Sequence, residues 1–151
     1  MSLNPFDIHY TVLAKHAQHV VLIHFPIALL ITGAAFDFLS QWTKRRGLAD
    51  AAYFNFFAAA IFTLPTLATG ILAWRFALEG QKLKGLLLEH TVLAWISSLL
   101  IWVIWATHFR ARKQPHPLLP TYRLWIELAA VTSIALTGHL GGFLSGVNGQ
   151  G

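Results

Sequence analysis

The chain contains no cysteine, and its single methionine is Met1. Without thiols it cannot form disulfides or thiolate metal sites, and it cannot attach a c-type haem through a CxxCH motif. A metal ligand would therefore have to be a histidine, a carboxylate or a backbone oxygen. Histidine, with eight copies in the chain, is the leading candidate for that role.

Charge is also scarce. Only 11% of the 151 residues are Asp, Glu, Lys or Arg, and 56% are hydrophobic, whereas a soluble domain usually carries about 25% charge. Much of the surface must therefore face lipid. The formal net charge of +5 is expected to set the orientation in a membrane, and we do not predict nucleic-acid binding from it.

Four apolar runs are long enough to cross a bilayer, which takes about 20 helical residues. They cover residues 16–41, 51–78, 87–109 and 122–144. Lipid cannot satisfy open backbone groups, so each run must be a helix. The short connections favour an up-down-up-down order. We therefore predict an all-α fold, an integral-membrane four-helix antiparallel bundle that forms one domain over residues 1–151.

The basic residues predict which way the bundle faces. The loops after the first and third runs and the start of the fourth hold seven: Lys44, Arg45, Arg46, Arg110, Arg112, Lys113 and Arg123. The opposite side holds four: Lys15, Arg75, Lys82 and Lys84. The positive-inside rule places the seven in the cytoplasm and both termini on the periplasmic side. Residues 1–15 are expected to form a cap or a short interfacial helix there.

Four of the histidines within the apolar runs lie toward the predicted periplasmic face, namely His19, His24, His90 and His139. An ionisable residue inside a span is costly and by default suggests a functional site. His24 lies about 7 Å deeper than His19, at a depth similar to that of His139, while His90 matches His19. Each matched pair joins two helices, as the axial imidazoles of a b-type haem do. We predict His24 with His139 as the first ligand pair and His19 with His90 as the second.

Small and basic residues near these histidines allow two interpretations. Gly141 flanks His139, and Gly70 lies at a comparable depth on the second run. They would give a porphyrin room, although small residues also let membrane helices pack closely without a ligand. Arg75, at the outer end of the second run, could pair with a haem propionate or simply extend to the interface.

Two acidic residues, Asp37 and Glu127, lie inside spans toward the cytoplasmic end. They could belong to a proton path or a quinone pocket. The favoured interpretation is that Glu127 pairs with Arg123 one turn away, and that Asp37 pairs with Arg45 or Arg46 or faces water. His108 and His116 are expected at the cytoplasmic interface.

The strings HVVLIHFPIALL, EHTVLAW and TGHLGGFLSG resemble a bacterial family of predicted four-helix membrane proteins, domain-of-unknown-function family 2231. Val20 stands where the family usually has proline, and residues 143–146 depart from its common LVYG. The family's motif positions correspond to His19, His24, His90, His139, Gly141 and Gly142. The resemblance implies a multi-pass protein of the bacterial inner membrane with a redox role, because related domains are found joined to Rieske or cytochrome domains.

The functional hypothesis is a membrane-bound b-type cytochrome that carries electrons near the periplasmic face through one or two bis-histidine haems. Candidate partners are lipid, membrane quinone, and a periplasmic redox protein or larger complex. No nucleophile–base set is apparent, which favours an electron-transfer protein or subunit over a stand-alone enzyme. The alternatives are a non-haem copper or zinc site and a cofactor-free anchor subunit of a larger complex.

Overall fold

A computed structural model describes residues 15–76, 78–114 and 119–146. These residues form four helices and no strand: α2 (Lys15–Thr43), α3 (Arg46–Phe76), α4 (Gly85–Arg112) and α5 (Arg123–Leu144). All four are long and apolar enough to cross a membrane. The predicted all-α membrane fold is confirmed, with span limits that differ by a few residues. The cap predicted for residues 1–15 falls almost wholly outside the described residues.

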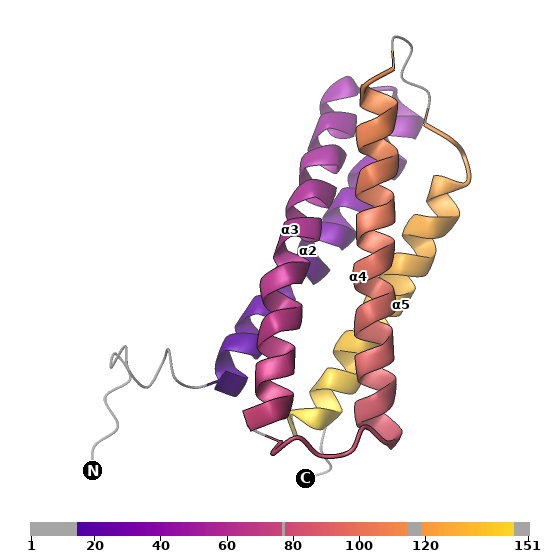
Figure 1. The fold of residues 1–151 in the computed structure, drawn as a ribbon. Coiled ribbons are helices and arrows are strands. Elements are labelled where there is room, and N and C mark those ends of the chain that lie inside the picture. The colour runs from indigo at the N-terminus through magenta and orange to yellow at the C-terminus, as the bar shows by residue number, and fades with distance from the viewer. Residues whose placement is uncertain (1–14, 77, 115–118, 147–151) are drawn as a thin grey trace.

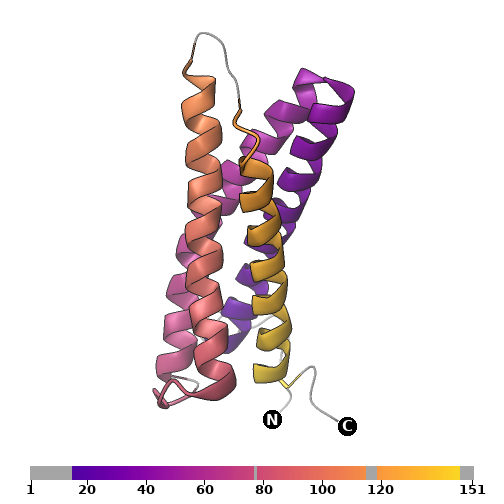
Figure 2. The same ribbon diagram turned by 90° about the vertical axis from the view of Figure 1, so that its right-hand side faces the viewer.

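The four helices form two antiparallel hairpins. In Figure 1 the α2–α3 and α4–α5 connections lie at the top of the bundle, and the α3–α4 connection lies at the bottom with the end of α5. Helix α2 packs chiefly against α3, and α4 packs chiefly against α5. Figure 2 shows the two hairpins inclined to one another. A polar site between the hairpins can therefore draw side chains from all four helices.

Each helix turns one line of residues, here called its seam, toward the bundle axis. Seam residues are spaced alternately four and three apart, the 3.5-residue average of helices packed in a left-handed bundle. The seams read His19, Ile23, Pro26, Leu30, Gly33, Asp37 on α2; Ala52, Phe56, Ala59, Thr63, Thr66, Gly70 on α3; His90, Ala94, Ser97, Ile101, Ile104, His108 on α4; and Arg123, Glu127, Ala130, Ile134, Thr137, Gly141 on α5. Polar residues therefore stand near both ends of the bundle, with apolar ones between them.

The hydrophobic core occupies the middle of the bundle and the half nearer the α2–α3 turn. Leu30, Phe56 and Ile101 are fully buried there, among alanines of α3 and α5. Large apolar side chains also cover the outside of the bundle, and Leu99 is 65% exposed and Trp125 74% exposed. An apolar outer surface on helices of this length is the surface expected to face lipid.

Pro26 lies inside α2 and removes the helical donor for the carbonyl of Leu22, four residues earlier. The hydroxyl of Thr66 on α3 lies 3.3 Å from that carbonyl oxygen and 2.8 Å from the carbonyl of Phe62. A neighbouring helix thus helps to satisfy the freed oxygen, which lipid could not do. This contact joins α2 to α3 beside the cavity described next.

Candidate functional site

A cavity of about 590 Å³ lies between the four helices, in the half nearer the α3–α4 connection. Its size falls within the usual range of ligand pockets, about 300–1,000 Å³. Apolar residues from all four helices, including tryptophans and glycines, make up most of its wall. Among the described residues that line it, only His19, His24 and His90 are ionisable.

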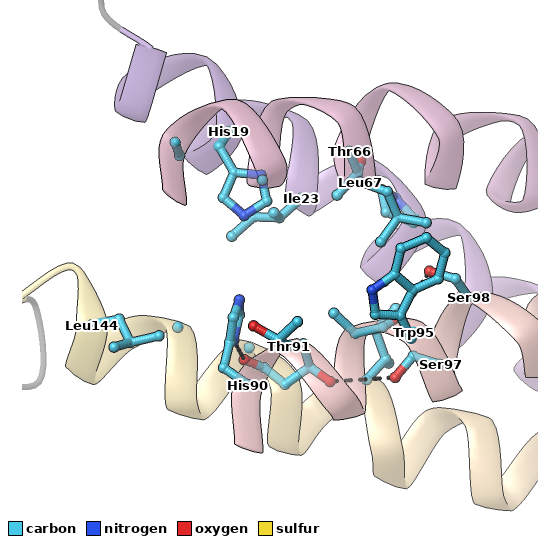
Figure 3. Close-up of a pocket in the computed structure, with 18 of the residues that line it drawn as sticks. His19, Ile23, Thr66, Leu67, His90, Thr91, Trp95, Ser97, Ser98 and Leu144 are labelled. Atoms are coloured by element: carbon cyan, nitrogen blue, oxygen red, sulfur yellow. Dashed lines mark hydrogen bonds between the residues drawn. The ribbon is translucent and has the colours of Figure 1, made fainter. Parts of the chain in front are cut away.

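His19 of α2 and His90 of α4 point toward one another across this cavity (Figure 3). They belong to different hairpins, so the two imidazoles face each other across the space between the hairpins. Both rings are partly buried. Two imidazoles on opposite walls can each present one nitrogen to a ligand that lies between them.

Hydrogen bonds determine which nitrogen each ring presents. His90 Nδ1 lies 3.0 Å from the carbonyl oxygen of Thr137; a carbonyl only accepts, so Nδ1 carries the proton. His19 Nδ1 lies 3.3 Å from the hydroxyl of Thr69, whose own proton is directed to backbone carbonyls of α3. In both neutral rings Nε2 then holds the lone pair. Metal-ligating histidines are oriented in this way, with the second nitrogen donating to a fixed acceptor.

A glycine supports each of the two rings. A Cβ placed on Gly70 would lie 3.0 Å from His19 Cε1, and one on Gly141 would lie 3.2 Å from His90 Cε1. Both distances are shorter than ordinary van der Waals contact, so any larger residue would displace an imidazole. Gly70 and Gly141 therefore let the two rings lie flat against α3 and α5.

The opposite end of the bundle holds four buried ionisable side chains, here called the ionic cluster: Asp37, His108, Arg123 and Glu127. Arg123 Nε donates to Asp37 Oδ2 at 2.9 Å. His108 Nε2 lies 3.3 Å from Glu127 Oε1. None of the four residues is more than 4% exposed. The cluster belongs to the packed half of the molecule, whereas the histidines line a cavity.

A family profile described as predicted membrane protein (DUF2231) matches residues 15–150. The chain belongs to this family. No curated protein and no solved structure gave a significant match. Membership in DUF2231 agrees with the four spans and assigns no activity, so the chemistry must be argued from the side chains.

The four predicted histidines of this DUF2231 protein lie in different settings. His24 lines the cavity beside His19, and its Nδ1 donates to the carbonyl of Val20 at 2.6 Å. His139 is exposed, is not among the residues that line the cavity, and lies edge-on to Phe143 with ring centroids 5.0 Å apart. Depth along the helix was the basis of the predicted pairs. His139 precedes the seam residue Gly141 by two positions, which turns it about 200° away.

The glycines predicted near the cofactor line the cavity, whereas the predicted arginine does not. Gly70 and Gly141 line the cavity, and so do Gly138 and Gly142. Arg75 is exposed and does not line it. If Arg75 contacts a bound cofactor, the contact must lie at the mouth of the cavity rather than on its wall.

The ionic cluster corrects the predicted ion pairs. Asp37 pairs with Arg123, not with Arg45 or Arg46, which are both exposed. Glu127 pairs with His108, which is buried within the bundle. Both errors came from treating residues near the helix ends as loop-facing, although the 4–3 spacing puts His108 and Arg123 on the seams. His116 lies outside the described residues.

Removing Arg123 from the loop charges leaves six exposed basic residues at that end of the bundle. Four of the chain's basic residues lie on the other side. The charge difference used to orient the protein therefore becomes smaller but keeps its sign.

Proposed function

We propose that this protein is a membrane-bound b-type cytochrome that binds haem in the cavity, with His19 and His90 as the axial ligands. One observation carries the proposal: two imidazoles from different hairpins face each other across an apolar cavity, each lying against a glycine. A haem bound by histidines on facing helices requires that arrangement. His19 and His90, which are the second pair in the depth-based prediction, thus become the favoured ligand pair.

The donors suit haem better than a closed zinc site. A structural zinc ion takes four protein ligands in a tetrahedron, and the described part of the cavity wall offers three imidazoles and no carboxylate. The facing imidazoles of His19 and His90 would hold the haem iron between them. When bound, haem would supply a one-electron change of iron oxidation state.

The protein's own residues would hold and tune such a group. Thr69 and Thr137 fix the tautomer of His19 and His90 by accepting from Nδ1, which raises the basicity of Nε2. Aliphatic side chains such as Ile23 and Leu87 exclude water from the space between the rings. Burial and hydrogen bonding of this kind are the means by which a protein sets a haem potential.

The location of the cavity suggests where electrons would enter and leave. By the positive-inside rule the cavity would lie at the periplasmic end of the bundle, and the membrane we propose is the bacterial inner membrane. A membrane quinone could then exchange electrons from the lipid side, and a periplasmic redox protein or a larger complex from the aqueous side. These partners are part of the proposal.

A reduced-minus-oxidised spectrum of protein purified from haem-replete cells, with metal analysis, tests the proposal. We expect a b-type α-band in the wild type, loss of most of it in His19→Ala and His90→Ala, and retention in the control His139→Ala. A band that survives both of the first two variants but not His24→Ala and His139→Ala would favour the depth-based pair instead. Stoichiometric copper or zinc without haem would favour a non-haem site, and no cofactor at all would favour an anchor subunit.

A further inference from the structure

The ionic cluster is far from the proposed haem site and is not used by it. Along α2 and along α4, 18 residues separate the seam histidine from the cluster residue, Asp37 or His108, which corresponds to about 27 Å of helix. That distance is close to the thickness of the hydrocarbon core, about 30 Å. The cluster therefore lies toward the opposite membrane face, and an inference about it is independent of haem binding.

The charges of the cluster do not balance without a proton. Asp37 and Glu127 bring two negative charges when ionised, and Arg123 brings one permanent positive charge. All three side chains are buried. An uncompensated buried charge costs several kcal/mol, so a second positive charge is required. Asp37, His108 and Glu127 can each bind a proton, and the hydrogen bonds of Arg123 decide among them.

Arg123 directs its hydrogen bonds to Asp37 and to two backbone carbonyls rather than to Glu127. Its Nε and Nη2 donate to the two oxygens of Asp37, at 2.9 and 3.5 Å, and its Nη1 donates to the carbonyls of Leu119 and Pro120. Glu127 is left with His108 as its hydrogen-bonding partner in the cluster. The proton that balances Glu127 must therefore lie on this pair.

Among the described residues, the charged neighbours of the His108–Glu127 pair are Asp37 and Arg123 of the cluster itself. From α2, Asp37 faces the pair and also accepts from Gln41 at 3.4 Å. From α3, the neutral ring of Phe56 lies 4.9 Å from the His108 ring. Asp50 of α3 is exposed and bound to Arg112 of α4 at 2.7 Å. From α5, the charged neighbour is Arg123 itself.

We propose that His108 and Glu127 form a proton-binding site in which one exchangeable proton is shared between imidazole Nε2 and carboxylate Oε1. When the proton moves from oxygen to nitrogen, an O–H bond breaks, an N–H bond forms, and a neutral pair becomes an ion pair. The net charge of the cluster is zero in both forms, so the proton can move without creating a buried net charge.

A metal ion would satisfy the same residues less well. Asp37, His108 and Glu127 can each offer a ligand atom within 4.8 Å of the others. A divalent cation among two carboxylates, a neutral imidazole and Arg123 would leave a net charge of +1 in the interior. A proton leaves no net charge, which is why the charge count favours it.

The test uses the intact protein in lipid nanodiscs, with infrared and ¹⁵N-histidine magnetic resonance spectra. At neutral pH the wild type should show either the carbonyl band of a protonated carboxyl group, shifted in D₂O, or an imidazolium signal from His108. Glu127→Gln should abolish both signals. His108→Gln should remove the imidazolium signal, so that the carboxyl band is the only one of the two that remains. Asp37→Asn frees the charge of Arg123 for Glu127 and should also abolish both. The surface control Asp50→Asn should change neither.

The wild-type spectra alone can overturn the proposal if a variant fails to fold. Absence of both signals would mean that the pair holds no proton. A signal that persists in folded Glu127→Gln or Asp37→Asn would mean that the proton lies elsewhere or that the charge count is wrong. Stoichiometric binding of added Zn²⁺ to the wild type, lost in Glu127→Gln, would show a metal site instead.

Discussion

The polar side chains at the two ends of this bundle have different surroundings: at one end they line a cavity, and at the other they pair with one another. At one end, His19 and His90 direct neutral rings into a cavity. At the other end, Asp37, Arg123, His108 and Glu127 are buried and pair with one another. On α2 and on α4, the seam histidine of the cavity and the cluster residue are 18 positions apart. Polar residues that satisfy one another inside a membrane span hold the helices together, whereas polar residues that surround a cavity suggest a ligand.

Glycines show the same contrast. Gly33 lies in the packed half, where a Cβ would come 2.8 Å from Phe56 Cε1, so it lets α2 approach α3. Gly70 and Gly141 lie at the cavity and accommodate imidazole rings instead. A small residue therefore serves helix packing at one end and ring placement at the other, as the two interpretations from the sequence allowed.

The largest effect is expected from removing the fixed cation of the ionic cluster. Arg123→Met would leave Asp37 and Glu127 buried without a permanent positive partner, and breaking one side of a buried pair costs about 3–5 kcal/mol. Unfolding in mixed detergent micelles measures the loss. The double variant Asp37→Leu with Arg123→Met should recover most of it. An Arg123→Met protein as stable as the wild type would show that the cluster does not stabilise the bundle.

Packing at Gly33 should give the next largest effect. Gly33→Ala forces the buried Phe56 ring or helix α2 to move, and overpacking of this kind costs about 1–3 kcal/mol. The matched control is Gly47→Ala, since a Cβ at the exposed Gly47 meets nothing within 4 Å. That control should be neutral or slightly stabilising, because alanine favours helix over glycine. Equal effects of the two changes would contradict the close contact of α2 with α3.

At the cavity end the same substitution should affect ligand binding more than folding. Gly141→Ala brings a methyl group to 3.2 Å from His90 Cε1, and the proposed haem should be retained about tenfold less well, equal to ~1.4 kcal/mol. Its control is Gly47→Ala, since Gly47 does not line the cavity and a Cβ there meets nothing within 4 Å. Haem titration of both variants measures the difference. A similar loss in both would remove the special role of Gly141.

Much of the fold could be predicted from the sequence because the membrane restricts the choices. Long apolar runs must be helices in lipid, and the short connections allow little except antiparallel neighbours. The four spans were therefore placed to within a few residues. The position of each residue along its helix could also be predicted, since each residue advances a helix by about 1.5 Å.

The direction in which a side chain points was harder to predict, and that is where the errors arose. Seam membership depends on the 4–3 spacing, which places His19, His90, His108 and Arg123 inward and turns His139 away. That spacing is present in the sequence, but the small difference in hydrophobicity between inner and outer faces hides it, because lipid and core are both apolar. Marking the polar residues 18 positions apart on α2 and α4 would have revealed it.

The smallest effect should come from an ion pair with the same chemistry outside the cluster. Arg112 and Asp50 meet at 2.7 Å, closer than the 2.9 Å of Arg123 and Asp37, yet their side chains are 44% and 54% exposed. Solvent screens such a pair, so Asp50→Asn should cost less than about 1 kcal/mol. Asp37→Asn removes one of two buried negative charges and should cost more. Unfolding of both variants side by side compares them, and a larger loss for Asp50→Asn would mean that burial does not set the energies of these two pairs.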